Sequence, residues 1–115
     1  MSKDLNRCYM IARLCKDPEL STTTGGTSVC KFSVANNDSY TKNGEKKETV
    51  SFFNVVCWGK TGEVINQYCK KGSKIAIEGR LIQRRWEKDG KHKSKTKVYA
   101  DCVMFVGSRK DREQQ

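Results

Sequence analysis

Residues 50–58 read Val50-Ser51-Phe52-Phe53-Asn54-Val55-Val56-Cys57-Trp58. β-Branched and aromatic residues dominate this stretch, which predicts a β-strand. Because side chains alternate along a strand, the odd-numbered residues share one face and the even-numbered residues share the other. Both faces then carry large apolar side chains, whereas a strand with one solvated face would alternate apolar with polar residues. The face of Phe52 and Trp58 therefore either lies under another layer or is exposed for a flat ligand to stack on.

The charge of the chain indicates what such a ligand would be. Its 115 residues carry 23 Lys+Arg against 13 Asp+Glu, a formal net charge of +10. An excess of this size favours a polyanionic partner, with nucleic acid first and an anionic membrane surface second. In a chain of this charge, nucleobases are the obvious candidates to stack on the second face.

The order of predicted elements indicates an all-β fold. We expect five strands, at 5–14, 29–35, 50–58, 73–86 and 94–106, and one helix at 60–71 between the third and fourth strands. The turn signals between them are Gly25-Gly26, Asn43-Gly44 and Asp89-Gly90. This is the element order of an OB-fold, a five-stranded Greek-key barrel that binds oligonucleotides. The domain would span 1–107, followed by a short, disordered polar tail at 108–115.

Other features limit the functional classes. No run is long enough to span a bilayer and no signal peptide is present, so we expect a cytoplasmic protein without membrane attachment. The six cysteines show no zinc spacing, and His92 lies far from them in a lysine-rich turn. We interpret the cysteines as free, largely buried thiols in a reducing compartment. No constellation suggests catalysis, so we expect no enzymatic activity, no cofactor and no metal.

Basic residues concentrate in one predicted hairpin. Between residues 80 and 97 there are eight of them against Glu87 and Asp89, a net charge of +6 within 18 residues. The eight are Arg80, Arg84, Arg85, Lys88, Lys91, Lys93, Lys95 and Lys97. With Trp86 among them, the hairpin joins phosphate attraction to a stacking platform, the two ingredients of sequence-tolerant single-strand binding. The alternative to a binding site is an ordinary charged hairpin that is only solvated.

Three smaller expectations concern side-chain direction. In strand 5–14 the face with Tyr9 and Ile11 is amphipathic, so that face could meet a partner. In strand 94–106 we expect Cys102 on the core face, two residues after Ala100. Parity places Tyr40 on the core side, whereas a bulge, or an end to regular pairing at the two preceding asparagines, would turn it outward. The sequence leaves these alternatives open.

Several motifs together resemble the bacterial-type single-stranded DNA-binding protein family over about residues 3–107. They are Asn6-Arg7, Asp17-Pro18-Glu19, Phe52-Phe53-Asn54-Val55-Val56-Cys57-Trp58-Gly59-Lys60, Tyr68-Cys69-Lys70-Lys71-Gly72-Ser73 and Ile77-Glu78-Gly79-Arg80-Leu81 followed by Arg84-Arg85-Trp86. The resemblance implies an OB-fold that wraps single-stranded DNA without sequence preference, in replication, recombination and repair. It also implies a homo-oligomer, a homotetramer or a dimer, and a nucleoid-associated location. By motif match, its stacking aromatics fall on Tyr40, Phe52, Trp58 and Trp86.

Two departures from the family pattern are visible. Phe53-Asn54 stands where the family commonly has histidine and a basic or polar residue near subunit contacts, so the resemblance supports a dimer more firmly than a tetramer. The family usually ends in a long tail with an acidic, hydrophobic tip that recruits other proteins, but this sequence ends at Arg112-Glu113-Gln114-Gln115. Either the sequence is cut short of such a tail, or this version works without one, as a version from a phage or mobile element would. The sequence therefore leaves recruitment of partners through a tail open. The alternative functions are a dimeric primosome-type OB interaction module and an RNA-binding OB protein.

Overall fold

Six strands and one helix follow one another in residues 3–106, the part of the chain that the computed structural model describes. They are β1 (Cys8–Leu14), β2 (Glu19–Thr22), β3 (Ser28–Lys42), β4 (Glu45–Trp58), α1 (Gly59–Tyr68), β5 (Lys74–Lys88) and β6 (Lys91–Phe105). The predicted tail at 108–115 lies outside the described residues. Within them, no helix is long and apolar enough to cross a membrane.

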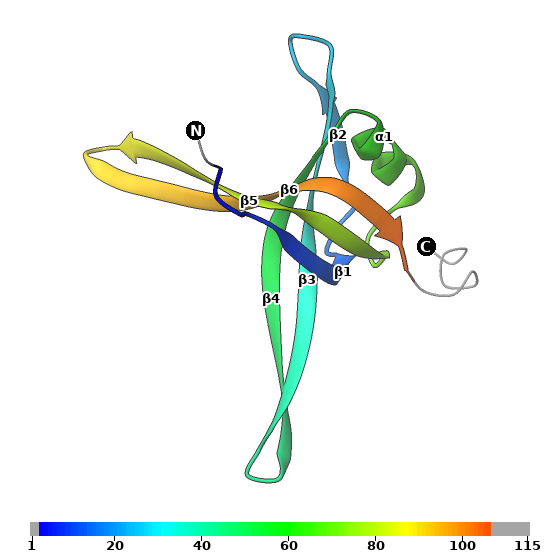
Figure 1. Cartoon of the computed structure of the whole chain (residues 1–115), viewed down its shortest axis with the longest axis vertical. Coiled ribbons are helices and arrows are strands. Elements are labelled where there is room, and N and C mark those ends of the chain that lie inside the picture. Colours follow the sequence, from blue (N-terminus) through cyan, green and yellow to red (C-terminus); the bar gives the residue numbers. More distant parts are fainter. Residues whose placement is uncertain (1–2, 107–115) are drawn as a thin grey trace.

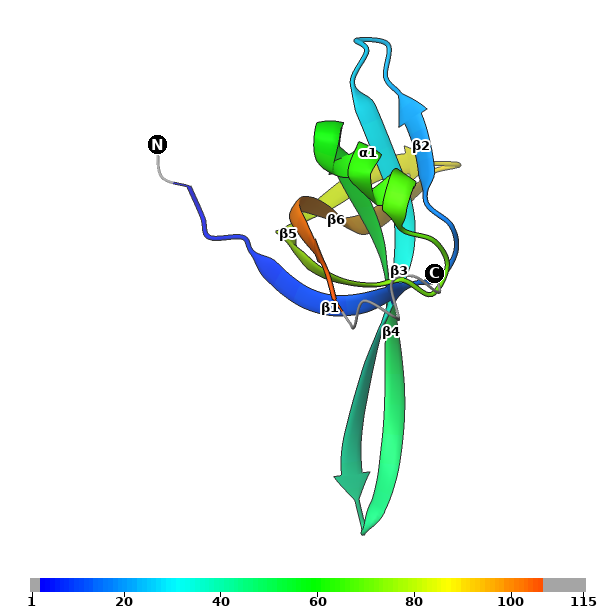
Figure 2. The same cartoon turned by 90° about the vertical axis from the view of Figure 1, so that its right-hand side faces the viewer.

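The sheet closes on itself into a barrel (Figures 1 and 2). The strands pair in the order β1-β5-β6-β4-β3, and a short β1–β3 pairing at Arg13↔Ala35 and Leu14↔Val34 joins the two ends. The β4–β6 pairing is parallel, and the other pairings are antiparallel. A five-stranded closed barrel with a single helix is the arrangement of an OB-fold, so the predicted fold class is confirmed.

Apolar side chains from all five barrel strands, most of them small or β-branched, fill the interior. The buried members are Ala12, Leu14, Cys30, Phe32, Val34, Val55, Cys57, Ile75, Ile77, Val98 and Ala100. Helix α1 packs against the β3 and β4 end of the barrel and adds Ile65 to this core. Gly62 makes that approach close, because a Cβ there would lie 2.8 Å from the Cys57 carbonyl oxygen.

Two long hairpins extend from the barrel, and Figure 1 shows them leaving it in different directions. Their tips are Asn43-Gly44 and Asp89-Gly90, and all four residues have positive φ, as type I′ turns require. The predicted ends at 35 and 50 are wrong, since β3 and β4 pair without interruption from Val29↔Trp58 to Lys42↔Glu45. A hairpin that is solvated on both faces carries no alternating apolar pattern, so sequence periodicity could not indicate how long its strands are.

Other differences from the sequence prediction are the start of β1 at Cys8 rather than at residue 5, the additional strand β2 and the end of α1. Strand β2 pairs with β3 where no strand was predicted, because its Glu-Leu-Ser-Thr sequence carries little strand signal. Helix α1 ends at Tyr68 rather than at residue 71, since Cys69 turns to an extended conformation and is buried in the core. Gly72, expected just past the helix, instead provides positive φ within a turn closed by the Ser73 N–H donating to the Lys70 carbonyl.

A β-bulge interrupts the β5–β6 pairing. Glu78 pairs with Cys102 but Gly79 pairs with Ala100, which leaves Asp101 as the extra residue. The bulge reverses the alternation on β6, so Cys102 is exposed rather than on the core face as predicted. Gly79 allows a close backbone approach at the bulge, because a Cβ there would lie 2.9 Å from the Ala100 Cα.

Candidate nucleic-acid interface

All four aromatic residues predicted to stack are exposed. The accessible fractions are 50% for Tyr40, 67% for Phe52, 43% for Trp58 and 46% for Trp86. None of them belongs to the core cluster. Large aromatic rings with this much accessible surface are available to a ligand, so the packing alternative for Phe52 and Trp58 does not hold.

The outward face of β4 was predicted correctly by strand alternation. Val55 and Cys57 point into the core, whereas Phe52 and Trp58 point outward. Val56 shares the outward face but is buried, because its neighbours on that face are Lys31 of β3 and Tyr99 of β6. The tyrosine ring also supports the tryptophan, since the Trp58 and Tyr99 centroids lie 6.1 Å apart in an edge-to-face arrangement.

Tyr40 is exposed for a reason that neither sequence alternative contained. Its strand pairs regularly with β4 through Tyr40↔Lys47, and no register shift occurs at the asparagines. The residue lies on the hairpin beyond the barrel, where neither face of the ribbon meets a core. Tyr40 is therefore accessible without the bulge that we considered.

The basic residues of the β5–β6 hairpin lie mainly on one face. Directly paired residues share a face, as in Arg84↔Lys95, Trp86↔Lys93 and Lys88↔Lys91. Arg80, paired with Tyr99, and Lys97, paired with Ile82, lie on the same face and complete a basic row around Trp86. Arg85 is the exception, because it lies on the opposite face, where its Nε donates to Gln83 Oε1 at 2.8 Å.

This basic face continues onto the barrel. The register places Arg80 beside Tyr99, Tyr99 beside Val56, and Val56 beside Lys31, so one outward row crosses β5, β6, β4 and β3. The sequence analysis missed Lys31 and Tyr99 as parts of the surface. Alternation alone marks both as outward, but only cross-strand register shows that they flank the β4 face.

The N-terminal segment fixes the base of the β5–β6 hairpin. Asn6 Nδ2 donates to the Leu81 carbonyl at 2.8 Å, and the Leu81 N–H donates to Asn6 Oδ1 at 2.9 Å. Arg7 pairs with the bulged Asp101 at 2.6 Å. Both charges of that pair are about half exposed, so its contribution to stability is small. Asn6 and Arg7 thus have a positioning role next to the site.

Three of the six cysteines, Cys30, Cys57 and Cys69, are buried in the core. Burial raises the pKa of Cys30 and of Cys69 to about 11. Burial, with smaller contributions from the other two thiols, raises the pKa of Cys57 to about 12. Cys8 and Cys15 are only partly buried and Cys102 is exposed, so the expectation of largely buried thiols holds for half of them. In residues 3–106, no cluster of His, Cys, Asp or Glu could hold a metal ion.

The aromatic and basic residues are therefore spread along two hairpins and the barrel face between them. Phe52 and Trp58 lie near the barrel, six residues apart on β4, or roughly 20 Å at about 3.3 Å per residue. Tyr40 lies on one hairpin and Trp86 on the other. Such a surface suits an extended anionic polymer with flat groups better than a compact ligand.

Comparisons with known proteins agree with this geometry. Residues 5–106 match the Single-strand binding protein family. The chain is similar to the single-stranded DNA-binding protein of Treponema pallidum, with 43% identity over 105 residues, 91% of this chain and 60% of the relative. It is also similar to the single-stranded DNA-binding protein of Aquifex aeolicus, with 38% identity over 112 residues, 96% of this chain and 76% of the relative.

Solved structures show the same fold. The wild-type single-stranded DNA binding protein from Thermus aquaticus superposes with a TM-score of 0.80 at 31% identity, covering 95% of this chain and 53% of that chain. The Plasmodium falciparum SSB in complex with ssDNA gives a TM-score of 0.83 at 24% identity, covering 93% and 99%, and at that identity supports the fold alone. This chain spans less than two thirds of the Treponema and Thermus proteins.

Proposed function

The chain belongs to the single-strand binding protein family, and we propose that it binds single-stranded DNA without sequence preference. The observation that carries the proposal is the combination of four exposed aromatic rings with a basic outward face on the same barrel and hairpins. Every base has a π-face, so stacking tolerates any sequence, and lysine and arginine side chains attract the phosphates. We infer a binding protein that protects the strand in replication, recombination and repair, and not an enzyme.

Each part of the surface would have a distinct role in binding. Tyr40, Phe52, Trp58 and Trp86 would each stack on a base, which contributes about 1–3 kcal/mol per base. The basic row of the β5–β6 hairpin would neutralise phosphates and release their counterions, so affinity would fall as salt rises. Arg85, on the reverse face, would contribute to the general field more than to the direct contact.

A titration with dT oligomers that follows tryptophan fluorescence at several salt concentrations tests this function. Trp58 and Trp86 are the only tryptophans, so stacking would quench the emission of the chain directly. We expect strong quenching and binding that weakens with salt. Unquenched fluorescence and weak, salt-insensitive binding would contradict the proposal and support a protein-interaction module. Competition between poly-dT and poly-U distinguishes DNA binding from RNA binding, because only poly-U carries the 2′-hydroxyl groups that an RNA-specific site would contact.

We also propose that the chain forms a homo-oligomer through the outer face of β1, β5 and β6. This face exposes Tyr9 at 71%, Ile11 at 50% and Met104 at 63%, with Ala76 between the last two in the paired strands. Exposed apolar side chains that gather on one sheet face are typical of interaction sites. A dimer built on this face, and a tetramer built from two dimers, would place several binding surfaces on one strand for wrapping.

Sedimentation measures this assembly. Ile11→Glu places a charge in the centre of the face, and we expect it to lower the measured mass to that of a monomer while the barrel stays folded. Lys46→Glu, on the hairpin away from that face, is the control and should leave the mass unchanged. A wild-type monomer would contradict the oligomer proposal but not the DNA-binding proposal.

The location follows from the partner. We infer that the protein acts in the cytoplasm in association with the nucleoid, where single-stranded DNA is exposed. All six cysteines are free thiols in the described structure, which is compatible with a reducing compartment.

A further inference from the structure

The base of the β5–β6 hairpin is where its direction is decided. Leu81 pairs with Val98 across the hairpin, and Val98 is the residue at which β6 leaves β4, through its pairing with Val55. On the other side, the β1–β5 ladder ends two residues short of Leu81, at Cys8↔Gly79. Residues 82–97 continue beyond these pairings to the tip, so whatever fixes the Leu81–Val98 pair fixes the direction of the whole hairpin.

Asn6 supplies the hold that the β1–β5 ladder does not reach. The Leu81 N–H donates to Asn6 Oδ1 at 2.9 Å, and Asn6 Nδ2 donates to the Leu81 carbonyl at 2.8 Å. A side-chain amide that exchanges two hydrogen bonds with one backbone residue imitates a paired residue of a neighbouring strand. The β1 side of β5 therefore stays fixed for two residues past Gly79.

The bulge between Glu78 and Gly79 gives this hold its importance. A β-bulge disrupts the ladder locally and bends the strand that carries it, and this one lies between the barrel and the hairpin. Arg7 Nη1 donates to Asp101 Oδ2 at 2.6 Å, and Asp101 is the extra residue of the bulge. Residues 6 and 7 thus contact β5 on the hairpin side of the bulge and β6 at the bulge itself, and together they form a clamp across it.

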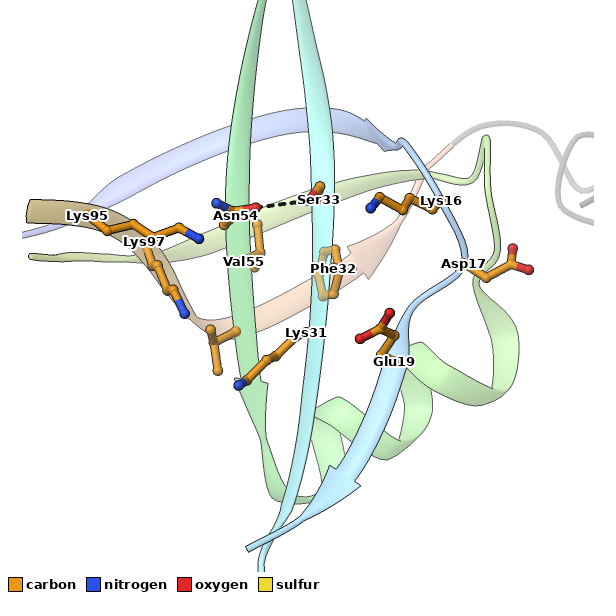
Figure 3. Close-up of a pocket in the computed structure, with 11 residues that line it drawn as sticks. Lys16, Asp17, Glu19, Lys31, Phe32, Ser33, Asn54, Val55, Lys95 and Lys97 are labelled. Atoms are coloured by element: carbon orange, nitrogen blue, oxygen red, sulfur yellow. Dashed lines mark hydrogen bonds between the residues drawn. The ribbon is translucent and has the colours of Figure 1, made fainter. Parts of the chain in front are cut away.

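The direction of the hairpin determines where Trp86 lies relative to the aromatic residues of β4. Trp86 is about 16 Å beyond Leu81 at about 3.3 Å per residue, so a rotation of about 20° at Leu81 would move its ring by about 6 Å. Figure 3 shows how the hairpin base meets β4, with Lys95 and Lys97 lining a groove beside Asn54. A single strand that stacks on both β4 and Trp86 needs their separation to be constant.

We propose that Asn6 and Arg7 are positioning residues, which fix the direction of the β5–β6 hairpin so that one strand engages the barrel face and Trp86 together. The inference rests on the proposed function and adds no contact with DNA. Two regions that bind one ligand act with an effective concentration set by their geometry, and a hairpin that is free to swing lowers it. Because Asn6 is exposed and the Arg7–Asp101 pair is about half exposed, the clamp adds little to the stability of the barrel.

The test compares Asn6→Ala with Asn66→Ala, which removes an amide from an exposed position on α1. Wild type and both variants are titrated with dT oligomers of about 4 and about 16 nucleotides. The short oligomer reaches one region and the long one spans both. We therefore expect Asn6→Ala to leave the affinity for the short oligomer unchanged and to lower the affinity for the long one about tenfold. Asn66→Ala should change neither affinity.

Two further measurements separate positioning from a loss of structure. Hydrogen exchange at the Leu81 amide should become at least about tenfold faster in Asn6→Ala, because its acceptor is gone, while exchange at the buried Ile77 stays unchanged. In a double-mutant cycle with Trp86→Ala, the loss caused by Asn6→Ala should shrink from about tenfold to less than about threefold, because the ring that it positions is absent. A general destabilisation would leave the loss equal in both backgrounds and would overturn the inference.

Asp101→Asn tests the Arg7 half of the clamp. It replaces the ion pair with a neutral contact, leaves every basic residue in place and raises the net charge by one. If Arg7 contacted DNA directly, this variant would bind the long oligomer more tightly. As a clamp residue Arg7 loses its anchor, so we expect an affinity for the long oligomer that is about two- to fivefold lower. A gain in affinity would overturn the role of Arg7.

The outcomes separate this inference from the proposed function. Absence of wild-type binding to both oligomers would contradict the proposed function and the inference with it. Wild-type binding with equal losses for the short and the long oligomer in Asn6→Ala would overturn the inference alone, because Asn6 would then touch the strand or support the barrel. Unchanged affinity for the long oligomer would also overturn it, because the direction of the hairpin would not limit binding.

Discussion

The β3–β4 and β5–β6 hairpins are built alike but carry different chemistry. Their strands have 15 and 14 residues in one hairpin and 15 and 15 in the other, and both tips are positive-φ turns ending in glycine. The β3–β4 hairpin beyond the barrel, residues 36–51, holds three lysines against Asp38, Glu45 and Glu48 and is neutral. The β5–β6 hairpin holds a net charge of +6 between residues 80 and 97.

The two hairpins also join the barrel differently. The β3–β4 ladder runs from the barrel to its tip without a shift in register, whereas the β5–β6 ladder contains the bulge at Gly79. Backbone geometry thus provides two similar ribbons, and the side chains distinguish them. We expect one ribbon to offer an aromatic ring with little electrostatic attraction, and the other to combine stacking with phosphate contacts.

The largest expected difference concerns charge. Arg84→Gln/Lys91→Gln/Lys93→Gln removes three charges from the Trp86 face of the β5–β6 hairpin, and Lys42→Gln/Lys46→Gln/Lys47→Gln removes three from the other. We expect the first triple variant to lower the salt slope by about 2 and the affinity for dT oligomers by about 100-fold at about 0.1 M salt. The second should change the slope by less than about 1. Equal slopes would remove the distinction between the hairpins.

The second largest effect is expected for residues that stack on bases. Trp86→Ala should cost about 1–3 kcal/mol of binding free energy, a loss of about 5- to 150-fold, because one base loses its ring. Tyr40→Ala should have a loss near the lower end, since no basic face holds the strand against that ring. Isothermal titration with dT oligomers measures both, and a larger loss for Tyr40→Ala would reverse the comparison. Neither change should lower the melting temperature, because both rings lie outside the core.

The attachment of the hairpins can be compared through two glycines. Gly79→Ala places a Cβ 2.9 Å from the Ala100 Cα at the bulge, so the backbone must move, and we expect a destabilisation of up to about 3 kcal/mol. Gly44→Ala meets open space at the other tip but requires positive φ, at a cost of about 1 kcal/mol. Urea denaturation gives both values. Equal values would mean that the bulge tolerates a side chain.

The charge variants should have their smallest effect on the reactivity of the buried thiols. The raised pKa values of Cys30, Cys57 and Cys69 lower their thiolate fraction at pH 8 at least about 100-fold relative to a thiol of pKa 9.0. They should therefore label slowly with iodoacetamide, and faster only as pH rises toward 11, while Cys102, which is exposed in the single chain, labels readily in the monomeric Ile11→Glu variant. Peptide mass spectrometry should find this pattern unchanged in both triple variants. Rapid labelling of Cys57 in either one would show that the charge changes disturb the barrel.

Much of the surface was predictable because alternation is a local property. The outward direction of Phe52 and Trp58 and the inward direction of Val55 and Cys57 follow from strand parity. The two hairpin tips follow from Asn43-Gly44 and Asp89-Gly90. Cys102 shows where strand parity fails. The extra residue, Asp101, reverses the direction of every later side chain on β6, and the sequence pattern gives no sign of it.

The sequence by itself determined the local features: strand faces, turn positions, the single helix and the amount and place of positive charge. The tertiary structure alone decided which strands are neighbours, how far the two hairpins extend beyond the barrel, and where the helix ends. It also brought Tyr99 against Trp58 and placed Lys16, Lys31, Lys95 and Lys97 around one groove. Those contacts join residues far apart in the chain, and they depend on cross-strand register, which closure of the whole barrel selects and no short segment encodes.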